Sequence, residues 1–248
     1  MKKVSGHIVS FIFAAALMQG CSTSQTLNKS SDALYKEGES FYQRGRYEEA
    51  IAQWKKVKES YQSPELSTQA ELQIADAYFL NGDYIEAATA YEDFRKLHPS
   101  HQQAGFALFR QGMSNYKQIN GIDTDQTPVK NALTIFESYI KLYPTGEQLV
   151  EVQEKIRDCM DKQLQYELYV GRFYLKTGAY KSAIGRFEDA LRLYPDLARR
   201  DEALYYLGRS YLEDGQKAKG REVFGKLSSE FPGSPFISDA NKAMDSFF

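Results

Sequence analysis

Small and aromatic residues recur along the chain in a pattern typical of paired helices. In the first copy Gly38 and Phe41 lie in one predicted helix, Gly45 follows, and Ala50 and Trp54 lie in a second predicted helix. Small residues allow two helices to approach closely, and a glycine readily ends a helix in a left-handed conformation. A proline closes each copy, because proline cannot continue a helix. The pattern therefore predicts helical hairpins.

The pattern occurs five times, with a degenerate middle copy. The small residue of the first helix is, in turn, Gly38, Ala75, Gly112, Gly171 and Gly208. This is the tetratricopeptide repeat, whose copies stack because one hairpin cannot bury its own apolar face. After Pro232, Ser234 is predicted to cap a last helix with an apolar stripe at Ala240, Met244 and Phe247. We expect an all-α fold: a tetratricopeptide-repeat solenoid of five helical hairpins with a C-terminal capping helix.

Two insertions interrupt the repeat period. The small residue of the second helix recurs after 37 residues at both ends of the array, but after 45 and 51 residues in the middle. The first insertion predicts a polar loop at residues 118–127. The second predicts one continuous helix over residues 147–176, about 45 Å long at 1.5 Å per residue. This helix should join an N-terminal half, residues 33–144, to a C-terminal half, residues 145–248.

One face of each first helix should line the concave surface of the solenoid. With the small residue counted as position 8, this face comprises positions 2, 5, 9 and 12. In the first three repeats it carries aromatic rings and a few acids, which suits an extended apolar peptide. The alternative is that some of these rings belong to the core, since the register of the third repeat is irregular. The candidate groove residues are Tyr35, Tyr42, Leu72, Phe79, Phe106, Phe109 and Tyr116.

The same face becomes basic in the last two repeats. Arg172 occupies position 9 of the fourth repeat, and Arg209 occupies position 9 of the fifth. These two arginines are candidates for docking a protein partner.

The N-terminal segment has the features of an export signal. Two lysines precede an apolar run of about 11 residues, which is too short to span a membrane. Residues 1–20 are therefore predicted to be a signal peptide, and Gly20-Cys21 looks like a lipoprotein processing site. Residues 21–32 would then be a lipidated cysteine and a flexible tether. Since Ser22 rather than an aspartate follows the cysteine, the resemblance to sorted lipoproteins implies that the anchor lies in the outer membrane, on its periplasmic side. The alternative is an ordinary secretory peptide in which Cys21 is incidental.

The remaining composition argues against chemistry and against nucleic acid. The 31 Lys and Arg residues balance 33 Asp and Glu residues, so no basic excess is available for phosphates. His98 and His101 straddle Pro99 and are expected to be exposed turn residues, and Cys159 is expected to be a buried thiol. No metal motif or catalytic set is recognisable. We expect no enzyme activity, no metal and no cofactor.

Three stretches give a more specific resemblance: residues 94–99 (FRKLHP), 123–127 (DTDQT) and 167–195. With the signal and five repeats, the chain resembles the BamD family, the tetratricopeptide lipoproteins of the outer-membrane β-barrel assembly machinery. The resemblance implies that the C-terminal repeats dock on the periplasmic domains of the barrel-forming subunit, alongside other assembly lipoproteins. It also implies that the N-terminal groove binds signal peptides of unfolded barrel clients. Arg186 matches the family's arginine linked to coupling with the barrel subunit.

Some positions depart from the family pattern, and rival scaffolds fit part of the chain. Met18, Gln19, Thr124 and Gly220 stand where the family or the repeat usually has other residues. A pilotin lipoprotein or the periplasmic repeat protein of the Tol-Pal system would also be a scaffold. A cell-wall enzyme would need a separate catalytic domain, and residues 33–248 are filled by repeats and cap.

Overall fold

The computed structural model describes residues 29–195 and 198–247. The predicted signal peptide and Cys21 lie outside this part of the chain. The described residues form helices and connecting turns with no strand, which confirms the all-α prediction. Within them, no helix is long and apolar enough to cross a membrane. The helices are α1 (Ser31–Gln43), α2 (Tyr47–Ser60), α3 (Pro64–Asn81), α4 (Tyr84–Leu97), α5 (Ala104–Lys117), α6 (Thr127–Leu142), α7 (Leu149–Lys176), α8 (Tyr180–Leu193), α9 (Arg200–Glu213), α10 (Lys217–Glu230) and α11 (Ile237–Phe247).

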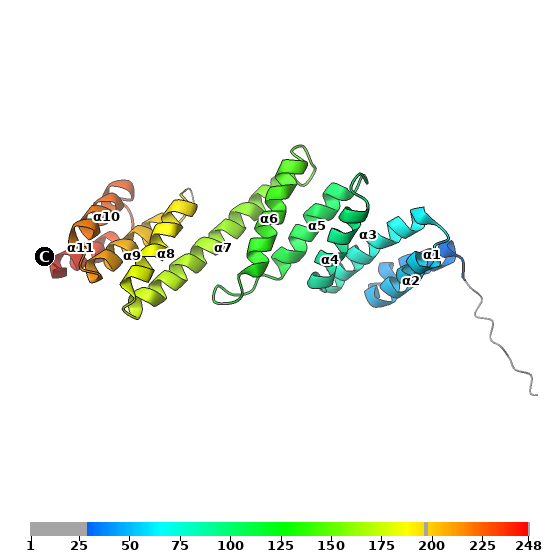
Figure 1. The fold of residues 1–248 in the computed structure, drawn as a ribbon, viewed down its shortest axis with the longest axis horizontal. Helices are drawn as coiled ribbons and strands as arrows, with labels where there is room; N and C mark the ends of the chain where they lie inside the picture. Colours follow the sequence, from blue (N-terminus) through cyan, green and yellow to red (C-terminus); the bar gives the residue numbers. More distant parts are fainter. Residues whose placement is uncertain (1–28, 196–197, 248) are drawn as a thin grey trace, which may run out of the picture.

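The helices follow one another along an elongated molecule, with α1 and α11 near opposite ends (Figure 1). Consecutive helices pair into five hairpins from α1/α2 to α9/α10, and α11 packs on α9 and α10. The capping helix begins at Ile237 rather than directly after Ser234. Ser234 instead accepts a hydrogen bond from the Phe236 amide (3.2 Å) and donates one to Asp201 (2.6 Å), so it links the turn to α9.

Four of the five hairpins are held by a ring of the second helix placed against a glycine of the first helix. A Cβ atom added to Gly171 would lie 2.5 Å from Cε1 of Phe187, so only a glycine allows this ring to sit there. Equivalent pairs are Gly38 with Trp54, Gly112 with Phe136, and Gly208 with Phe224. In the fifth hairpin the methyl carbon Cδ2 of Leu212 would lie 2.6 Å from a Cβ on Gly220. The leucine thus occupies the space that the repeat's usual alanine would fill.

Glycines also end the first helix in four of the five hairpins. Gly82 has φ +89°, a left-handed conformation that glycine adopts without steric cost, and its amide closes the last turn of α3. The third hairpin has no such glycine, because residues 118–126 form the predicted loop between α5 and α6. The others are Gly45, Gly178 and Gly215.

Helix α7 takes part in two different cores. Val152, Ile156 and Cys159 pack with α5 and α6, whereas Leu164 and Leu168 pack with α8 and α9. Its bounds confirm the predicted long helix to within two residues at its start. Both cores share this helix, so they do not define a boundary between two halves of the chain. The predicted division into residues 33–144 and 145–248 stays a prediction. Cys159 is fully buried, and burial raises its pKa to about 12, which confirms the buried thiol.

Candidate functional site

The N-terminal groove begins with rings of the first repeat that surround Trp54. The ring of Tyr42 lies 5.6 Å from that of Trp54 and 5.5 Å from that of Tyr47, and Tyr35 lies 6.2 Å from Trp54. Trp54 is fully buried, whereas Tyr35 and Tyr42 are half-buried. Desolvation raises the pKa of both tyrosines. These two residues therefore belong partly to the core and present part of each ring at the surface.

Two further rings of the groove meet at an arginine. The guanidinium carbon of Arg110 lies 3.7 Å from the centroid of the Phe79 ring and 5.7 Å from that of the Phe106 ring. Cations over aromatic faces are stabilised by the ring quadrupole. Phe79 comes from α3, whereas Phe106 and Arg110 come from α5, so this cluster joins two repeats. Sequence reasoning missed Arg110, because it occupies position 6 and not one of the four groove positions.

A polar network of Tyr91 and Asp76 holds the side chain of Arg110 in place. Nε of Arg110 donates a hydrogen bond to the Tyr91 hydroxyl (3.2 Å) and lies 3.6 Å from Oδ1 of Asp76. Tyr91 in turn donates a hydrogen bond to Asp76. Burial raises the pKa of Asp76, against the lowering effect of its bonds to Tyr91 and Arg110. Burial and the Asp76 charge also raise the pKa of Tyr91, so its hydroxyl remains the donor.

Two predicted groove residues are buried instead of lining the groove. Leu72 is 4% exposed and packs with Ala107 of the next repeat, and Phe109 is 7% exposed in the core shared with α7. Both occupy position 5, which faces the first helix of the following repeat. The prediction that this position is open to solvent was therefore wrong for the internal repeats.

The predicted groove residue Tyr116 is tied to α7. Its hydroxyl donates to Oδ2 of Asp158 at 2.5 Å, and Nζ of Lys155 lies 4.6 Å from the ring centroid. The ring is half-buried beside the core of α5, α6 and α7. Tyr116 thus links the N-terminal repeats to the long helix, while Phe79 and Phe106 remain with Tyr35 and Tyr42 as candidate groove residues.

Arg172 and Arg209 border the same pocket of about 330 Å³ between α7 and α9. Nη1 of Arg172 lies 2.6 Å from Oε1 of the buried Glu202, so the pair holds the two helices together. Arg209 donates to the Tyr205 hydroxyl (3.2 Å) and to Glu213 (3.3 Å). Its buried Nε has no hydrogen-bond partner among the described residues. The structure therefore brings these two sequence-predicted arginines together.

Arg186 lies apart from that pocket. It is on α8, and its Nη1 lies 2.9 Å from Oε2 of Glu167 on α7. The hydrogen bond to Glu167 raises its pKa above the ordinary value. The side chain remains 38% exposed, so it is available to a partner at the cost of sharing or breaking one ion pair.

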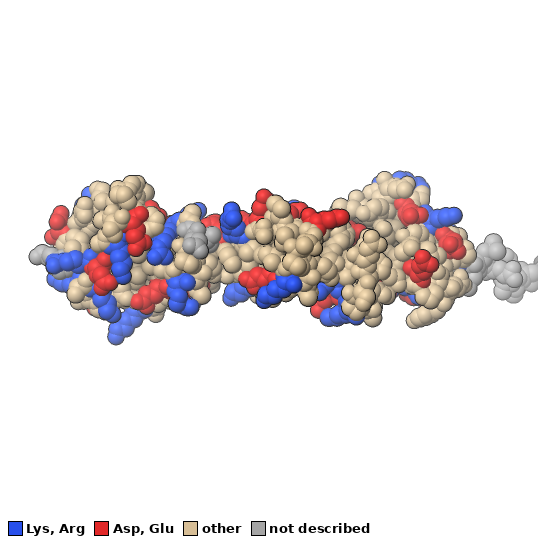
Figure 2. All heavy atoms as spheres, turned by 90° about the horizontal axis from the view of Figure 1, so that it is seen from above, with Lys and Arg blue, Asp and Glu red and all other residues tan. Residues whose placement is uncertain are grey.

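Charges of both signs are interspersed over the face seen in Figure 2. This agrees with the pairing of Arg172, Arg186 and Arg209 with carboxylates. Among the residues that the structure describes, no group of three or more His, Cys, Asp or Glu side chains is placed to hold a metal ion.

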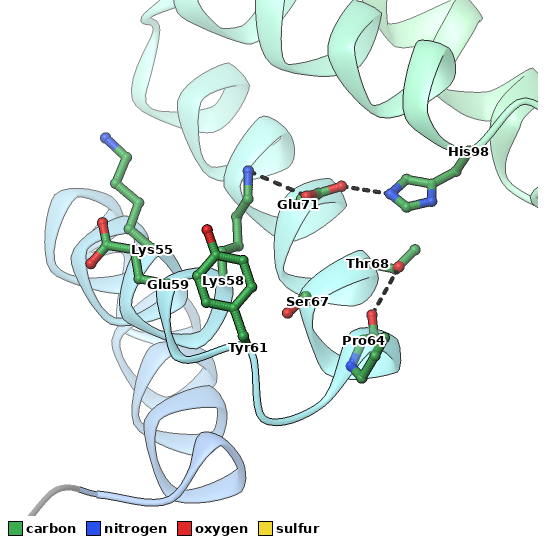
Figure 3. Close-up of a pocket in the computed structure, with 9 residues that line it drawn as sticks. All are labelled: Lys55, Lys58, Glu59, Tyr61, Pro64, Ser67, Thr68, Glu71 and His98. Atoms are coloured by element: carbon green, nitrogen blue, oxygen red, sulfur yellow. Dashed lines mark hydrogen bonds and ion pairs between the residues drawn. The ribbon is translucent and has the colours of Figure 1, made fainter.

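A separate pocket of about 560 Å³ lies at the ends of α2, α3 and α4 (Figure 3). Glu71 accepts from both sides of it: Nε2 of His98 lies 2.6 Å from Oε2, and Nζ of Lys58 lies 3.4 Å from Oε1. His98 follows the end of α4 as expected, but its side chain is 26% exposed and pairs with Glu71, so the expectation that it is an exposed residue was wrong. Tyr61 lies at the rim with φ 52° and is 89% exposed.

Stacked hairpins with half-buried aromatic rings and several surface arginines define a tetratricopeptide-repeat scaffold, a class that binds other proteins on extended helix faces. Residues 27–223 match the YfiO family, described as outer membrane lipoprotein, and the chain belongs to this family. Its association with the outer membrane follows from this membership.

Several curated relatives are similar over most of the chain. An outer membrane protein assembly factor BamD from Caulobacter vibrioides is 26% identical over 243 residues, covering 96% of this chain and 80% of that protein. The BamD of Rickettsia prowazekii is 28% identical over 214 residues, covering 86% of this chain and 85% of its own. Among solved structures, the TPR2AB-domain:pHSP90-complex of yeast Sti1 is similar with a TM-score of 0.45 and 14% identity, covering 87% of this chain and 84% of that one.

Proposed function

We propose that the protein is a non-enzymatic scaffold of the outer-membrane β-barrel assembly complex. It docks on the barrel-forming subunit and helps to recruit, assemble and insert outer-membrane β-barrel proteins. The observation that carries the proposal is the family match over residues 27–223, together with relatives named outer membrane protein assembly factors. The repeat array supports it, because stacked helix faces are suited to binding proteins.

The proposed attachment is a lipid on Cys21. An N-terminal lipid would hold the folded repeats at the periplasmic face of the outer membrane through the tether, which is shorter than expected because Ser31 and Asp32 belong to α1. Family membership supports this arrangement, since the family is described as outer membrane lipoprotein. Replacing Cys21 by alanine should release the protein from the membrane; unchanged membrane association would refute the lipid anchor.

The proposed client site is the surface of Phe79, Phe106 and Arg110, extended by Tyr35 and Tyr42. Aromatic rings offer apolar contact to a client side chain, and the guanidinium offers a charged hydrogen-bond donor to a peptide carboxylate. The Tyr91–Asp76 network supports this role, because it holds the arginine by Nε and thereby orients the guanidinium. The preferred client is thus an unfolded barrel protein whose terminal residue is aromatic.

The proposed docking surface for the barrel-forming subunit is on the C-terminal half, with Arg172, Arg186 and Arg209. The other assembly lipoproteins are further partners of the same complex. Arg186 is the arginine that best tests this surface, because it is exposed and its ion pair crosses from α8 to α7.

The test is capture of the barrel-forming subunit's periplasmic domains by the immobilised mature protein. The Arg186→Glu variant should capture markedly less while its helical circular dichroism stays the same. Arg192→Glu is a matched control on the same helix, since Arg192 is 66% exposed and pairs only along α8 with Asp189. Equal capture by the wild type and Arg186→Glu would remove this residue from the interface, and no capture by the wild type would overturn the proposed function.

A further inference from the structure

The first helix of a repeat meets the preceding hairpin through positions 3, 7 and 10. In the second, third and fifth repeats all nine of these residues are buried, and eight are apolar or small. Gln111 of α5, for example, accepts a hydrogen bond from Arg95 of the preceding α4 at 2.9 Å. The nine residues are Ala70, Ile74 and Ala77 of α3, Ala107, Gln111 and Ser114 of α5, and Ala203, Leu207 and Ser210 of α9.

The fourth repeat differs at all three positions. They hold Tyr166, Val170 and Phe173, of which Phe173 is 58% exposed and the other two are half-buried. Tyr169 lies beside them and is 41% exposed. Among the described residues, none of these four belongs to the cores on either side of α7. Positions that are covered by a hairpin in three other repeats are thus left at the surface here.

The reason is that α7 carries this contact face twice. The preceding hairpin packs on Val152, Ile156 and Cys159, each 14 residues before its counterpart in the fourth repeat. Fourteen residues make about four helical turns, so the two sets lie on nearly the same face of α7, about 21 Å apart. Because of the insertion in α7, the third repeat packs on the first set, and the second set is left uncovered.

We propose that the second set, Tyr166, Val170 and Phe173 with the adjoining Tyr169, is a docking site for an α-helix of a partner protein. The first set, on the same face of α7, is already covered by the helix α6, which shows that a helix can pack on this face. The uncovered set spans residues 166–173, about two helical turns, which lies within the length of the 14-residue helices that cover the equivalent faces, α2, α4 and α8. An amphipathic helix laid on an apolar face is a common mode of recognition.

The side chains of the site define the partner helix further. Tyr166 and Phe173 are large where the other repeats have alanine or serine, so a closely packed partner helix needs small residues opposite them. Lys176 lies three residues after Phe173 and makes that end of the apolar stripe basic, whereas Lys162 at the other end pairs with Asp158 (3.6 Å). The partner helix is therefore one with a small apolar stripe and an Asp or Glu residue at the end that meets Lys176.

This inference rests on the proposed function in one respect, that the partner belongs to the outer-membrane assembly complex. It concerns a different surface from the groove of Phe79 and Phe106. Arg186 lies close to this surface, because it pairs with Glu167, the neighbour of Tyr166 on α7. A partner that contacts Arg186 through charge could therefore also contact this surface through apolar packing.

The experiment is site-specific photocrosslinking of the full-length lipoprotein in its own cell envelope. A benzophenone amino acid replaces Tyr169, and in a matched control it replaces Tyr61, an 89% exposed aromatic residue far along the array. Crosslinked peptides are identified by mass spectrometry. The expected result is that position 169 crosslinks to one helical segment with an acidic residue at one end of its small apolar stripe, and that position 61 does not. Crosslinks from position 169 to a strand, to a second copy or to the protein's own N-terminal segment would overturn the proposal, as would none above the control.

Variants at Phe173 provide the second measurement. With the benzophenone at position 169, Phe173→Lys should reduce the crosslinked yield at least tenfold, whereas Phe173→Tyr should retain it. Because Phe173 is largely exposed, circular dichroism should be the same for both. An unchanged yield with Phe173→Lys would overturn the site alone, provided that the wild type still captures the barrel-forming subunit. Loss of that capture by the wild type would instead count against the proposed function.

Discussion

Arg110 of α5 lies over the ring of Phe79 of α3, with 3.7 Å between the guanidinium carbon and the ring centroid. The two residues belong to different repeats, so the groove surface exists only when the hairpins are stacked. Nε of the same arginine is held by Tyr91 of α4. A charged group and an apolar ring are thus presented together at a fixed distance.

The carboxylate-binding role proposed for Arg110 can be tested with a peptide that ends in phenylalanine. We expect Arg110→Met to lower the affinity of the mature protein for this peptide about tenfold, since a hydrogen bond to a charged group contributes about 1.5 kcal/mol. Isothermal titration calorimetry measures the change. The same peptide with an amidated C-terminus should bind the wild type and the variant equally.

Lys117→Met is the control for this experiment, because Lys117 is an exposed cation on the same helix. It should leave the affinity unchanged. An equal loss of affinity for the free and the amidated peptide on Arg110→Met would mean that the arginine acts only through packing on Phe79.

The close approach of α7 and α8 depends on the absence of a side chain at Gly171. A methyl group there would lie 2.5 Å from the Phe187 ring, so Gly171→Ala must displace a fully buried ring. We expect a loss of about 1–3 kcal/mol in the free energy of unfolding, which exceeds the gain of about 0.5–1 kcal/mol from replacing a helical glycine. Urea denaturation followed by circular dichroism measures the difference.

Gly185 of α8 is the matched control in the same hairpin. A Cβ atom there meets nothing within 4 Å, so Gly185→Ala should stabilise the protein by about 0.5–1 kcal/mol. If both alanine variants were stabilised, the ring contact would not limit the approach of the two helices.

Leu72 was predicted to line the groove but is buried in the core, and its substitution tests this difference. Because its side chain is buried between α3 and α5, we expect Leu72→Ala to lower the free energy of unfolding by about 2–5 kcal/mol. Phe106→Ala, at a half-buried groove position, should cost less stability and more peptide affinity. Thermal unfolding measures the stability of the two variants, and calorimetry measures their peptide affinity. An unchanged melting temperature for Leu72→Ala would mean that the Leu72 side chain is not buried.

Cys159 should make the stability of the protein depend on alkaline pH. Burial raises its pKa from 9.0 to about 12, so the folded thiol stays protonated while the unfolded thiol ionises. The stabilisation from this group is fully present below pH 9 and is lost as the pH rises toward 12. Denaturant unfolding of the wild type and Cys159→Ala between pH 8 and 10 should give a difference in stability that shrinks as pH rises.

The same burial should protect the thiol from reagents. In native mature protein with Cys21 replaced by alanine, Ellman's reagent should react with Cys159 only after denaturant is added. Rapid reaction of the native protein would show that the thiol is accessible.

Features set by local signals were predictable from the sequence. Four glycines with positive φ, the loop before α6 and the 28-residue helix α7 follow from glycine, proline and the repeat period. Features that depend on contacts between repeats could not be predicted from the sequence. The burial of Leu72 depends on the next repeat, and Arg110 joins the groove because Phe79, Asp76 and Tyr91 meet it from neighbouring helices. The contact of His98 with Glu71 likewise crosses from the end of α4 to α3.

The single helix shared by the two cores determines how the halves of the molecule can move. A continuous helix resists bending and twisting, because either motion would strain consecutive backbone hydrogen bonds. A rotation imposed on the repeats before Cys159 is therefore passed to the repeats after Leu164 as a rotation of the whole helix. The two halves of the array that share α7 are consequently coupled in orientation as well as in distance.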